Sequence, residues 1–283
     1  MIRVHIAMVG LNRSLSFTWP SIQREVVEPV RRSPFTCATF QAELIIPRGG
    51  GVNNPRSGEF GNIETALPEA FTSWTVRYLK EQEALRHARQ TGTDPAEARG
   101  EWDDGGKSWQ NFLTYLAALD VAYEHDANLQ SADLVVLIRP DIAISARLHL
   151  MFWVTLIYLW SRWNPEIAVV PSWGRFRGVN DRFAILTGPA AKRYMRRICD
   201  VEDFLNVQPK SNSEIFLRET LSGARVLHAI GARMVRVRIG GRYEPKDLGH
   251  LGPPPLVSYL KRKMRRLRKA SIHLMRGLRS KGD

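Results

Sequence analysis

Arginine and aspartate side chains directly follow one of the most apolar runs of the chain. The run 133–138 has the β-branched and leucine content of a buried strand, and Pro140 ends it because proline cannot donate to a central sheet ladder. Just beyond the strand, Asp141 could hold a divalent metal or a ribose hydroxyl, and Arg139 could meet a phosphate. The same two residues could instead form a salt bridge around a turn.

Two further segments carry carboxylates at similar places. Asn180 and Asp181 precede a Phe-Ala-Ile-Leu run, so their side chains are expected at the mouth of a sheet, or else in a turn that introduces a short strand. Glu214 is expected in the first turn of a helix whose N-cap is Ser211 or Asn212. A capping box there would by itself be a sufficient structural reason for Glu214.

These segments belong to a chain in which apolar strands alternate with helical patterns. Strands are expected at 4–9, 37–46, 133–138, 167–170 and 234–239, and helices at 21–30, 70–90, 107–125, 189–200 and 212–221. This alternation predicts an α/β fold with a mostly parallel sheet flanked by helices. Ligands of such sheets bind beyond the carboxyl ends of the strands, which is where the carboxylates above are expected.

The apolar run 148–160 is too short to span a bilayer, which needs roughly 20 apolar residues. It predicts a buried helix, with Trp153, Trp160 and Trp163 in core and helix-end packing. In contrast, the segment from Pro47 to Gly61 is rich in Gly, Asn and Pro and predicts a long loop. That loop, with Arg48 and Arg56, could close over phosphates as a lid or could be a disordered surface loop.

The positive charge is concentrated at the end of the chain. The net charge is +13, and residues 261–283 hold ten basic residues against one acidic residue, so the preceding 260 residues carry only +4. The prolines at 253–255 mark a boundary between an α/β domain, 1–250, and a basic tail, 256–283. Apolar residues recur in the tail every three or four positions, as in an amphipathic helix on an anionic membrane surface. A nucleic-acid-binding arm or a solvated helix are the alternatives.

The cysteine content and the first ten residues bear on the cellular compartment in which the protein is expected. The two cysteines, Cys37 and Cys199, have no zinc or disulfide-scaffold spacing, which fits a reducing environment. The apolar segment 1–10 is too short for a signal sequence and predicts a core strand. We therefore expect a cytoplasmic protein, at most peripheral on the inner face of a membrane.

Several motifs resemble, in the same order, a group of bacterial and algal GT-A-like glycosyltransferases. The resemblance spans about residues 2–240 and includes the Arg-Pro-Asp strand end, the Gly-Val-Asn-Asp-Arg-Phe-Ala-Ile segment at 178–185 and the Glu-Ile-Phe-Leu helix at 214–217. The opening Gly-Leu-Asn-Arg-Ser-Leu at 10–15, the Thr-x-x-Ser-Ile helix at 18–22 and the Gln-containing helix at 109–116 also resemble the group. The fold that this resemblance implies is GT-A-like, that is, Rossmann-like.

The resemblance implies a transferase that moves a sugar from a nucleotide-sugar donor to a hydroxyl acceptor, in surface polysaccharide or glycan synthesis. The acceptor would be a glycan or a lipid-linked molecule. Asp181 is the first candidate for the base that an inverting reaction needs, and Glu214 is the second. The implied donor-binding residues are Gly10, Asn12, Arg13, Arg139, Asp141 and Asn180.

Asp141 would occupy the place of the DxD metal motif and could bind Mn²⁺ or Mg²⁺. The chain has one aspartate where that motif has two, so Arg139 could neutralise the diphosphate instead. The alternative function is a non-catalytic α/β module that binds a membrane surface or nucleic acid through its basic tail. Nucleic acid is the less expected partner, because the body of the chain carries little net charge.

Overall fold

A seven-stranded sheet forms the centre of the protein. The computed structural model describes residues 1–54, 59–63, 67–94, 107–174, 177–208, 212–229 and 232–248. The strand order is β10-β8-β9-β6-β1-β2-β5. The strands are β1 (Ile2–Leu11), β2 (Thr36–Ile46), β5 (Thr75–Lys80), β6 (Leu134–Ile138), β8 (Ile167–Pro171), β9 (Phe183–Thr187) and β10 (Arg225–Ala229).

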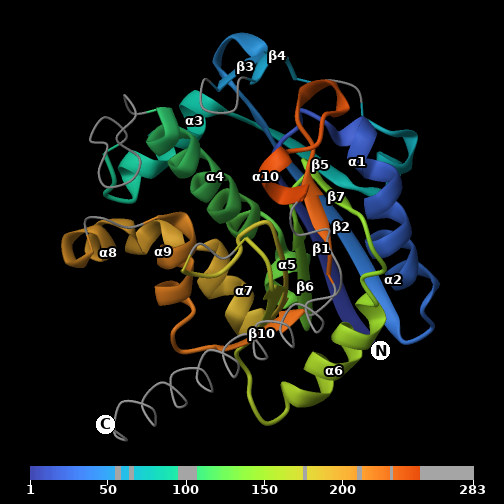
Figure 1. Cartoon of the computed structure of the whole chain (residues 1–283). Helices are drawn as coiled ribbons and strands as arrows, with labels where there is room; N and C mark the ends of the chain where they lie inside the picture. The colour runs from blue at the N-terminus through green and yellow to red at the C-terminus, as the bar shows by residue number, and fades with distance from the viewer. Residues whose placement is uncertain are drawn as a thin grey trace, which may run out of the picture.

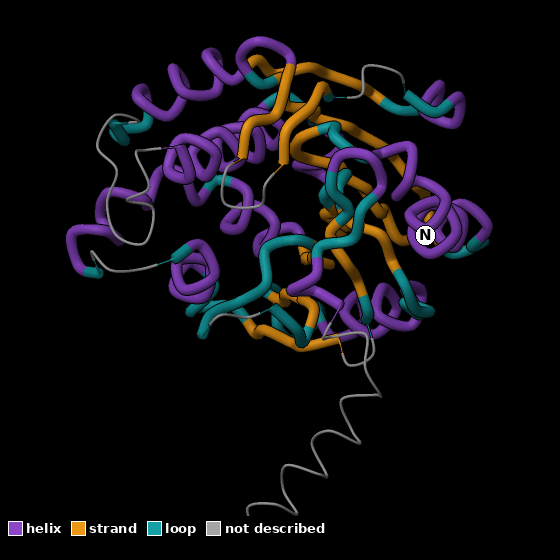
Figure 2. Tube along the Cα trace, turned by 45° about the horizontal axis from the view of Figure 1, so that its top comes forward, coloured by secondary structure: helices purple, strands orange, loops and turns teal. Residues whose placement is uncertain are grey.

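The sheet is mostly parallel. Strands β5, β2, β1 and β6 pair in parallel, as do β8 and β10, whereas β9 is antiparallel to both β6 and β8. Helices cover both faces of the sheet (Figures 1 and 2). The expected α/β class, with a mostly parallel sheet flanked by helices, is therefore confirmed.

Alternating side chains of the strands supply two separate cores. In β1, Ala7 and Val9 face one core, and Ile6 and Met8 face the other, as the period of two of a strand requires. Helices α3 (Glu81–Gln90), α4 (Lys107–Glu124), α5 (Ala127–Ser131), α7 (Gly188–Met195), α8 (Val201–Val207) and α9 (Ser213–Thr220) pack on the first face. Helices α1 (Leu15–Ile22), α2 (Glu28–Arg32) and α6 (Leu150–Trp160) pack on the second.

Two small sheets complete the architecture. Strands β7 (Ile142–Ile144) and β11 (Met234–Arg236) pair antiparallel, and they bring the end of the described chain beside the Asp141 segment. Strands β3 (Gly51–Asn54) and β4 (Glu59–Asn62) form a hairpin at one edge of the molecule (Figure 1). A single turn, α10 (Pro245–Leu248), follows β11.

Several expected elements need correction. The helix expected at 21–30 begins at Leu15 and contains Pro20, and a π-helical segment, Gln23–Val27, connects α1 to α2. The helix expected at 70–90 begins only at Glu81, because Thr75–Lys80 forms the edge strand β5. The loop expected at 47–61 contains the β3–β4 hairpin.

The helix in the apolar run 148–160 was expected to be buried, but only one side of it is. Leu150, Val154 and Ile157 of α6 are buried, whereas Phe152 and Leu159 are exposed. Trp153 and Trp160 pack against the core as expected, but Trp163 does not. Within the described residues, no helix combines the length and the apolarity that crossing a bilayer requires. The basic tail 256–283 lies outside the described residues.

Candidate functional site

A cavity of about 500 Å³ opens at the carboxyl ends of the central parallel strands. The chain leaves β1 toward β2 on one side and later enters β6 on the other side of β1, so the connections diverge between β1 and β6. Such a switch point leaves a crevice in which α/β proteins bind ligands. The cavity is lined by Gly10, Leu11, Arg13, Ile45, Pro47, Arg48, Gly51, Glu81, Ser108, Gln110, Asn111, Phe112, Thr114, Tyr115, Arg139, Asp181, Ser213, Arg236 and Arg238.

The lining is strongly basic, with five arginines and two carboxylates. Guanidinium groups form forked hydrogen bonds that match phosphate and carboxylate groups. The first half of α4 contributes Gln110, Asn111 and Thr114 to the same lining. The buried hydroxyl of Thr114 has no hydrogen-bond partner among the described residues, so it can donate to a ligand. The cavity therefore fits an anion that also carries neutral polar groups.

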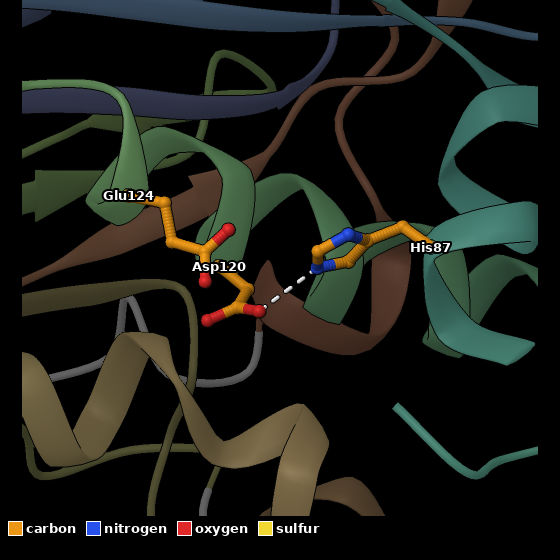
Figure 3. Close-up of side chains that lie close together, drawn as sticks. All are labelled: His87, Asp120 and Glu124. Carbon is orange, nitrogen blue, oxygen red and sulfur yellow. Dashed lines mark hydrogen bonds and ion pairs between the residues drawn. The ribbon is translucent and has the colours of Figure 1, made fainter. Parts of the chain in front are cut away.

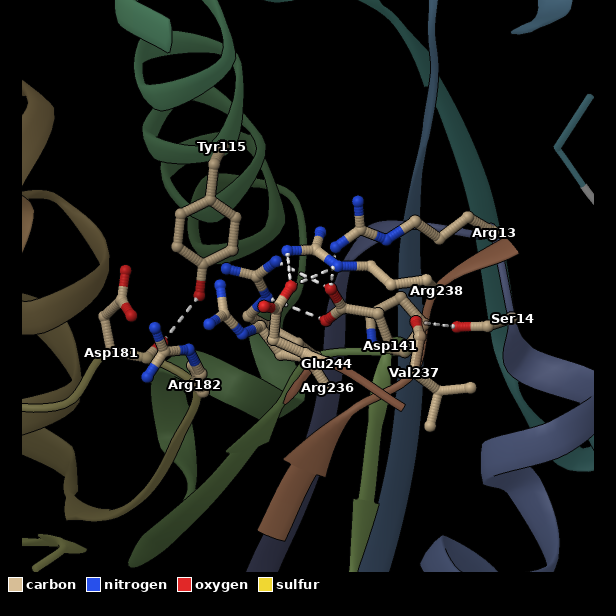
Figure 4. Close-up of polar contacts among 12 residues, drawn as sticks. Arg13, Ser14, Tyr115, Asp141, Asp181, Arg182, Arg236, Val237, Arg238 and Glu244 are labelled. Atoms are coloured by element: carbon tan, nitrogen blue, oxygen red, sulfur yellow. Dashed lines mark hydrogen bonds and ion pairs between the residues drawn. The ribbon is translucent and has the colours of Figure 1, made fainter. Parts of the chain in front are cut away.

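Asp141 lies behind the cavity wall rather than in it. Arg139 donates two hydrogen bonds to the Asp141 carboxylate, at 3.0 and 2.9 Å, and Arg13 donates a third (Figure 4). Burial alone would raise the pKa of Asp141, but the charges of Arg139 and Arg13 hold it well below its ordinary range. The salt bridge considered from the sequence is thus present, and it includes Arg13 as well as Arg139.

The Asp141 ion pair fixes the positions of both arginines at the cavity. Arg139 lies with its guanidinium 5.4 Å from the centre of the Tyr115 ring. The backbone around Asp141 is held as well, because its carbonyl accepts from the Val237 backbone and Thr18 donates to the Pro140 carbonyl at 2.6 Å. Preorganised donors of this kind bind an anion without having to be ordered first.

Gly10 allows this close packing of the two strand ends. Its φ is +142°, and a Cβ at this position would lie 3.1 Å from the Cδ of Pro140. A side chain at Gly10 would therefore press β1 against the Arg-Pro-Asp turn. Gly10 and Arg13 line the cavity, whereas Asn12 is buried and does not.

Arg236 and Arg238 come from the far end of the described chain. Arg236 donates to Asp247 of α10 at 2.8 and 2.9 Å, and the Nε of Arg238 donates to Glu244 at 2.8 Å. These carboxylates do not line the cavity, so each arginine is held from behind while it faces the ligand space. Figure 4 shows Arg236 and Arg238 beside Asp141, with guanidinium groups gathered between Asp141 and the Tyr115 ring.

Sequence reasoning missed Arg236 and Arg238, although a signal was present. The segment 234–239 was expected to be a strand, and arginines two residues apart in a strand point to the same side. What the sequence did not show is that this strand pairs with β7, outside the main sheet, and so reaches the Asp141 segment.

Asp181 supplies one of the two carboxylates that line the cavity. Its backbone carbonyl accepts hydrogen bonds from Tyr115, at 3.2 Å, and from Tyr194, at 3.0 Å. Burial and the Asp181 charge raise the pKa of Tyr115 to about 12, so this hydroxyl stays a donor. Among the described residues, no group donates a hydrogen bond to the Asp181 carboxylate itself. Asp181 is thus held by its backbone and offers its side chain to the cavity.

The Asn180 side chain is engaged in hydrogen bonds to the local backbone. Its amide donates to the Trp173 carbonyl at 2.8 Å, and its side-chain oxygen accepts from the Arg182 backbone at 2.9 Å. It is fully buried and does not line the cavity. The expected turn that introduces a short strand is therefore present, because β9 begins at Phe183. A direct role of Asn180 in donor binding stays a prediction.

Glu214 is in the first turn of α9, and Asn212 is the N-cap. The Asn212 side chain accepts from the Ile215 backbone at 2.9 Å, so Glu214 is not the reciprocal partner in a capping box. Burial and the Asp181 charge raise the pKa of Glu214, against the opposing effect of Arg182 at 3.8 Å. Glu214 does not line the cavity, but it is electrostatically linked to Asp181.

The residues around Asp141 do not fit a divalent metal. Both oxygens of its carboxylate accept from guanidinium groups, and two arginine charges beside it would repel a cation. In the described part of the chain, the three-residue group with metal-ligand spacing is His87, Asp120 and Glu124 (Figure 3). That group lies toward the other end of α4, and Arg196 pairs with both of its carboxylates. It is explained as an ion-pair network between helices.

Comparison with known proteins adds a similarity of overall shape. Neither the known protein families nor the curated proteins contain a match to the sequence. Among solved structures, an active-site mutant of LgtC matches with a TM-score of 0.43 and 12% identity, over 80% of this chain and 72% of that one. The galactosyltransferase LgtC in complex with donor and acceptor sugar analogues matches with a TM-score of 0.38 and 13% identity, over 80% and 73%. With values this low, the chain's function has to be inferred from its own cavity.

Proposed function

We propose that the chain is a glycosyltransferase of GT-A-like architecture that moves a sugar from a nucleotide-sugar donor to a hydroxyl acceptor. The observation that supports this most is the composition of the switch-point cavity. It combines an arginine cluster, neutral polar groups of α4 and one carboxylate without a hydrogen-bond donor among the described residues. A nucleoside diphosphate linked to a sugar presents groups that match each of these: an anion, neutral hydroxyls and an electrophilic anomeric carbon.

In the proposed reaction, the arginines stabilise the leaving group. An acceptor oxygen forms a bond to the anomeric carbon of the sugar while the bond from that carbon to the diphosphate oxygen breaks. Negative charge then accumulates on the diphosphate, and fixed guanidinium groups in a partly dry site stabilise it more in the transition state than in the ground state. Arg139, Arg236 and Arg238 supply these groups, and Arg13 supports them from beside Asp141.

The acceptor hydroxyl must lose its proton in the same step if the reaction inverts configuration. Asp181 is the proposed base, because its carboxylate lines the cavity and is free to accept a proton. Glu214, the second candidate, is farther from the cavity and acts on Asp181 through its charge. We assign no step to a metal, because the surroundings of Asp141 do not fit one.

Attachment to a membrane is also part of the proposal. Residues 256–283 would lie on an anionic surface, and the acceptor would be a glycan or a lipid-linked molecule in surface polysaccharide synthesis. The support is the basic, amphipathic sequence of the tail. This arrangement corresponds to a cytoplasmic enzyme on the inner face of a membrane.

Calorimetric titration with UDP, GDP and ADP tests the donor site. Binding is expected in EDTA as well as in Mn²⁺, and it should weaken with rising salt because the site is cationic. Arg139→Gln should weaken binding at least about tenfold, the usual scale for loss of a charge-assisted hydrogen bond. Asp141 keeps Arg13 in that variant, which protects the fold. Arg162→Gln, on the exposed surface away from the cavity, is the matched control.

Failure to bind any nucleoside diphosphate, with or without Mn²⁺, would refute the donor site. Binding that appears only with Mn²⁺ would show that the arginines do not replace a metal. If vesicle binding persists in a chain that binds no nucleotide, the alternative of a non-catalytic membrane-binding module is favoured.

A further inference from the structure

The outward face of α6 exposes large apolar side chains. Phe152 is 60% exposed, Leu159 is 51% exposed and Trp163, just after the helix, is 80% exposed. Phe152 and Leu159 are seven positions apart and therefore share one side of α6, and Trp163 lies in the turn that follows the helix; these three residues are here called the α6 stripe. The opposite side, which packs on the sheet, consists of Leu150, Val154 and Ile157.

No charged residue interrupts this surface, since the sequence of α6 from Leu150 to Trp160 contains none. Figure 1 shows α6 (yellow-green) at the outer lower edge of the molecule, close to the N-terminus. Apart from the exposed and uncharged Thr155, the helix thus presents large apolar side chains to solvent where a surface helix would normally carry polar ones. Large apolar side chains gathered on one exposed side mark an interaction site.

Three exposed arginines surround the α6 stripe. The guanidinium of Arg162 lies 5.8 Å from the centre of the Tyr158 ring, and that of Arg225 lies 3.9 Å from the centre of the Trp160 ring. Arg147 is exposed just before the helix. Within the described chain, none of these three arginines has a carboxylate partner. The rim of the stripe is therefore cationic, and its charges are available to an anionic partner.

We propose that the α6 stripe docks on an anionic lipid surface. An apolar helix face with tryptophan and tyrosine at its edge and arginines around it is the pattern of helices that lie in the interface plane of a membrane. Eleven residues span about 16 Å, roughly half of the hydrocarbon core, so α6 lies along the surface and does not cross it.

Charge argues for lipid over the other occupants of this face. The chain's own tail, 256–283, is strongly basic and would meet the like charges of the arginine rim. A second copy would bring the same arginines against each other, because a two-fold interface places identical patches together. An anionic lipid headgroup instead complements each arginine, while the acyl chains receive Phe152, Leu159 and Trp163. This docking does not depend on the proposed transferase activity.

Co-sedimentation of the full chain with vesicles tests the docking. Binding to vesicles of phosphatidylglycerol and phosphatidylcholine should exceed binding to phosphatidylcholine alone. Phe152→Ser, Leu159→Ser and Trp163→Ser combined should lower the partition coefficient at least about tenfold, because burial of these side chains is lost. Tyr78→Ser on β5 and Val207→Ser at the end of α8 are matched controls, since both residues are exposed elsewhere, and they should bind like the wild type.

Further measurements keep the result unambiguous. Brominated lipids should quench wild-type tryptophan emission more than that of Trp163→Phe, and Arg162→Gln with Arg225→Gln should weaken binding to anionic vesicles alone. Wild-type binding by the triple variant, when its melting temperature is unchanged, would overturn the proposal. Quenching of Trp163→Phe by brominated lipids to the same extent as the wild type would also overturn it. So would a wild-type oligomer, observed without vesicles, that the triple substitution dissociates.

Discussion

Replacing Asp141 with asparagine should destabilise the whole fold. The carboxylate is 1% exposed and is the shared acceptor of Arg139 and Arg13. Asparagine keeps the shape, but it removes the negative charge and turns an NH₂ group toward a guanidinium. Two arginine charges at the cavity wall would then lack the buried anion that compensates them.

The expected loss in the free energy of unfolding follows from the burial of this carboxylate. Removing one partner of a buried ion pair costs about 3–5 kcal/mol. Total stabilities of domains are roughly 5–15 kcal/mol, so Asp141→Asn should remove a large part of the stability. The matched control is Asp133→Asn, because Asp133 pairs at 2.9 Å with Arg3, whose side chain is 60% exposed. A surface pair of that kind contributes about 1 kcal/mol or less.

The pH dependence provides an independent check. The pKa of folded Asp141 lies well below its ordinary range, so its contribution is fully present above the unfolded value, about 3.9. Wild-type stability should therefore fall as the pH decreases below about 4, and this part of the fall should be absent in Asp141→Asn.

Urea denaturation followed by circular dichroism, at pH 7 and from pH 6 to pH 3, measures both effects. If Asp141→Asn unfolds within about 1 kcal/mol of the wild type at pH 7, the carboxylate is not the buried counter-ion described here. A consequence for assays is that loss of activity in Asp141→Asn cannot be assigned to ligand binding alone, whereas Arg139→Gln tests the ligand site more directly.

Other substitutions test the remaining parts of the site. Gly178→Ala should lower the melting temperature by several degrees in calorimetry, because a Cβ there would lie 1.8 Å from the Glu214 carbonyl oxygen; an unchanged value would refute this packing. Asp181→Asn should abolish sugar transfer while calorimetry still detects nucleoside diphosphate, and wild-type turnover would exclude Asp181 as the base. Because the pKa of Glu214 is raised in the folded state, its ionisation disfavours folding. Glu214→Gln should therefore gain stability relative to the wild type, by urea titration, as the pH rises above about 4.3, and the opposite slope would contradict this environment.

The sequence by itself determined the main strands of the sheet and the presence of charged residues at its carboxyl edge. The apolar strands around Val4 to Val9 and at 133–138 and 167–170 formed as expected. Short runs of β-branched residues bounded by Gly or Pro favour a strand over a helix. Pro140 ended β6, and the residues after it reached the carboxyl edge of the sheet. Arg139 and Asp181 were accordingly placed at the cavity.

Local patterns failed where a tertiary neighbour decided the outcome. Thr75–Lys80 lies within a stretch with helical spacing, but it pairs with β2 as an edge strand. Pro20 was expected to precede the helix, but it lies within α1, which already begins at Leu15. The apolar composition of α6 did not reveal that one of its faces has no protein to cover it.

Only the tertiary structure decided the role of each charge. In the sequence, Asp141 could equally be a metal ligand or half of a salt bridge. The outcome depended on Arg13, 128 positions away, which adds a second guanidinium to the same carboxylate. Arg236 and, two residues on, Arg238 reach the cavity because β11 pairs with β7 and the Val237 backbone donates to the Asp141 carbonyl. Sequence spacing carries no information about such contacts, since they join segments that only folding brings together. The physical reason is that a buried carboxylate takes its function from the charges around it.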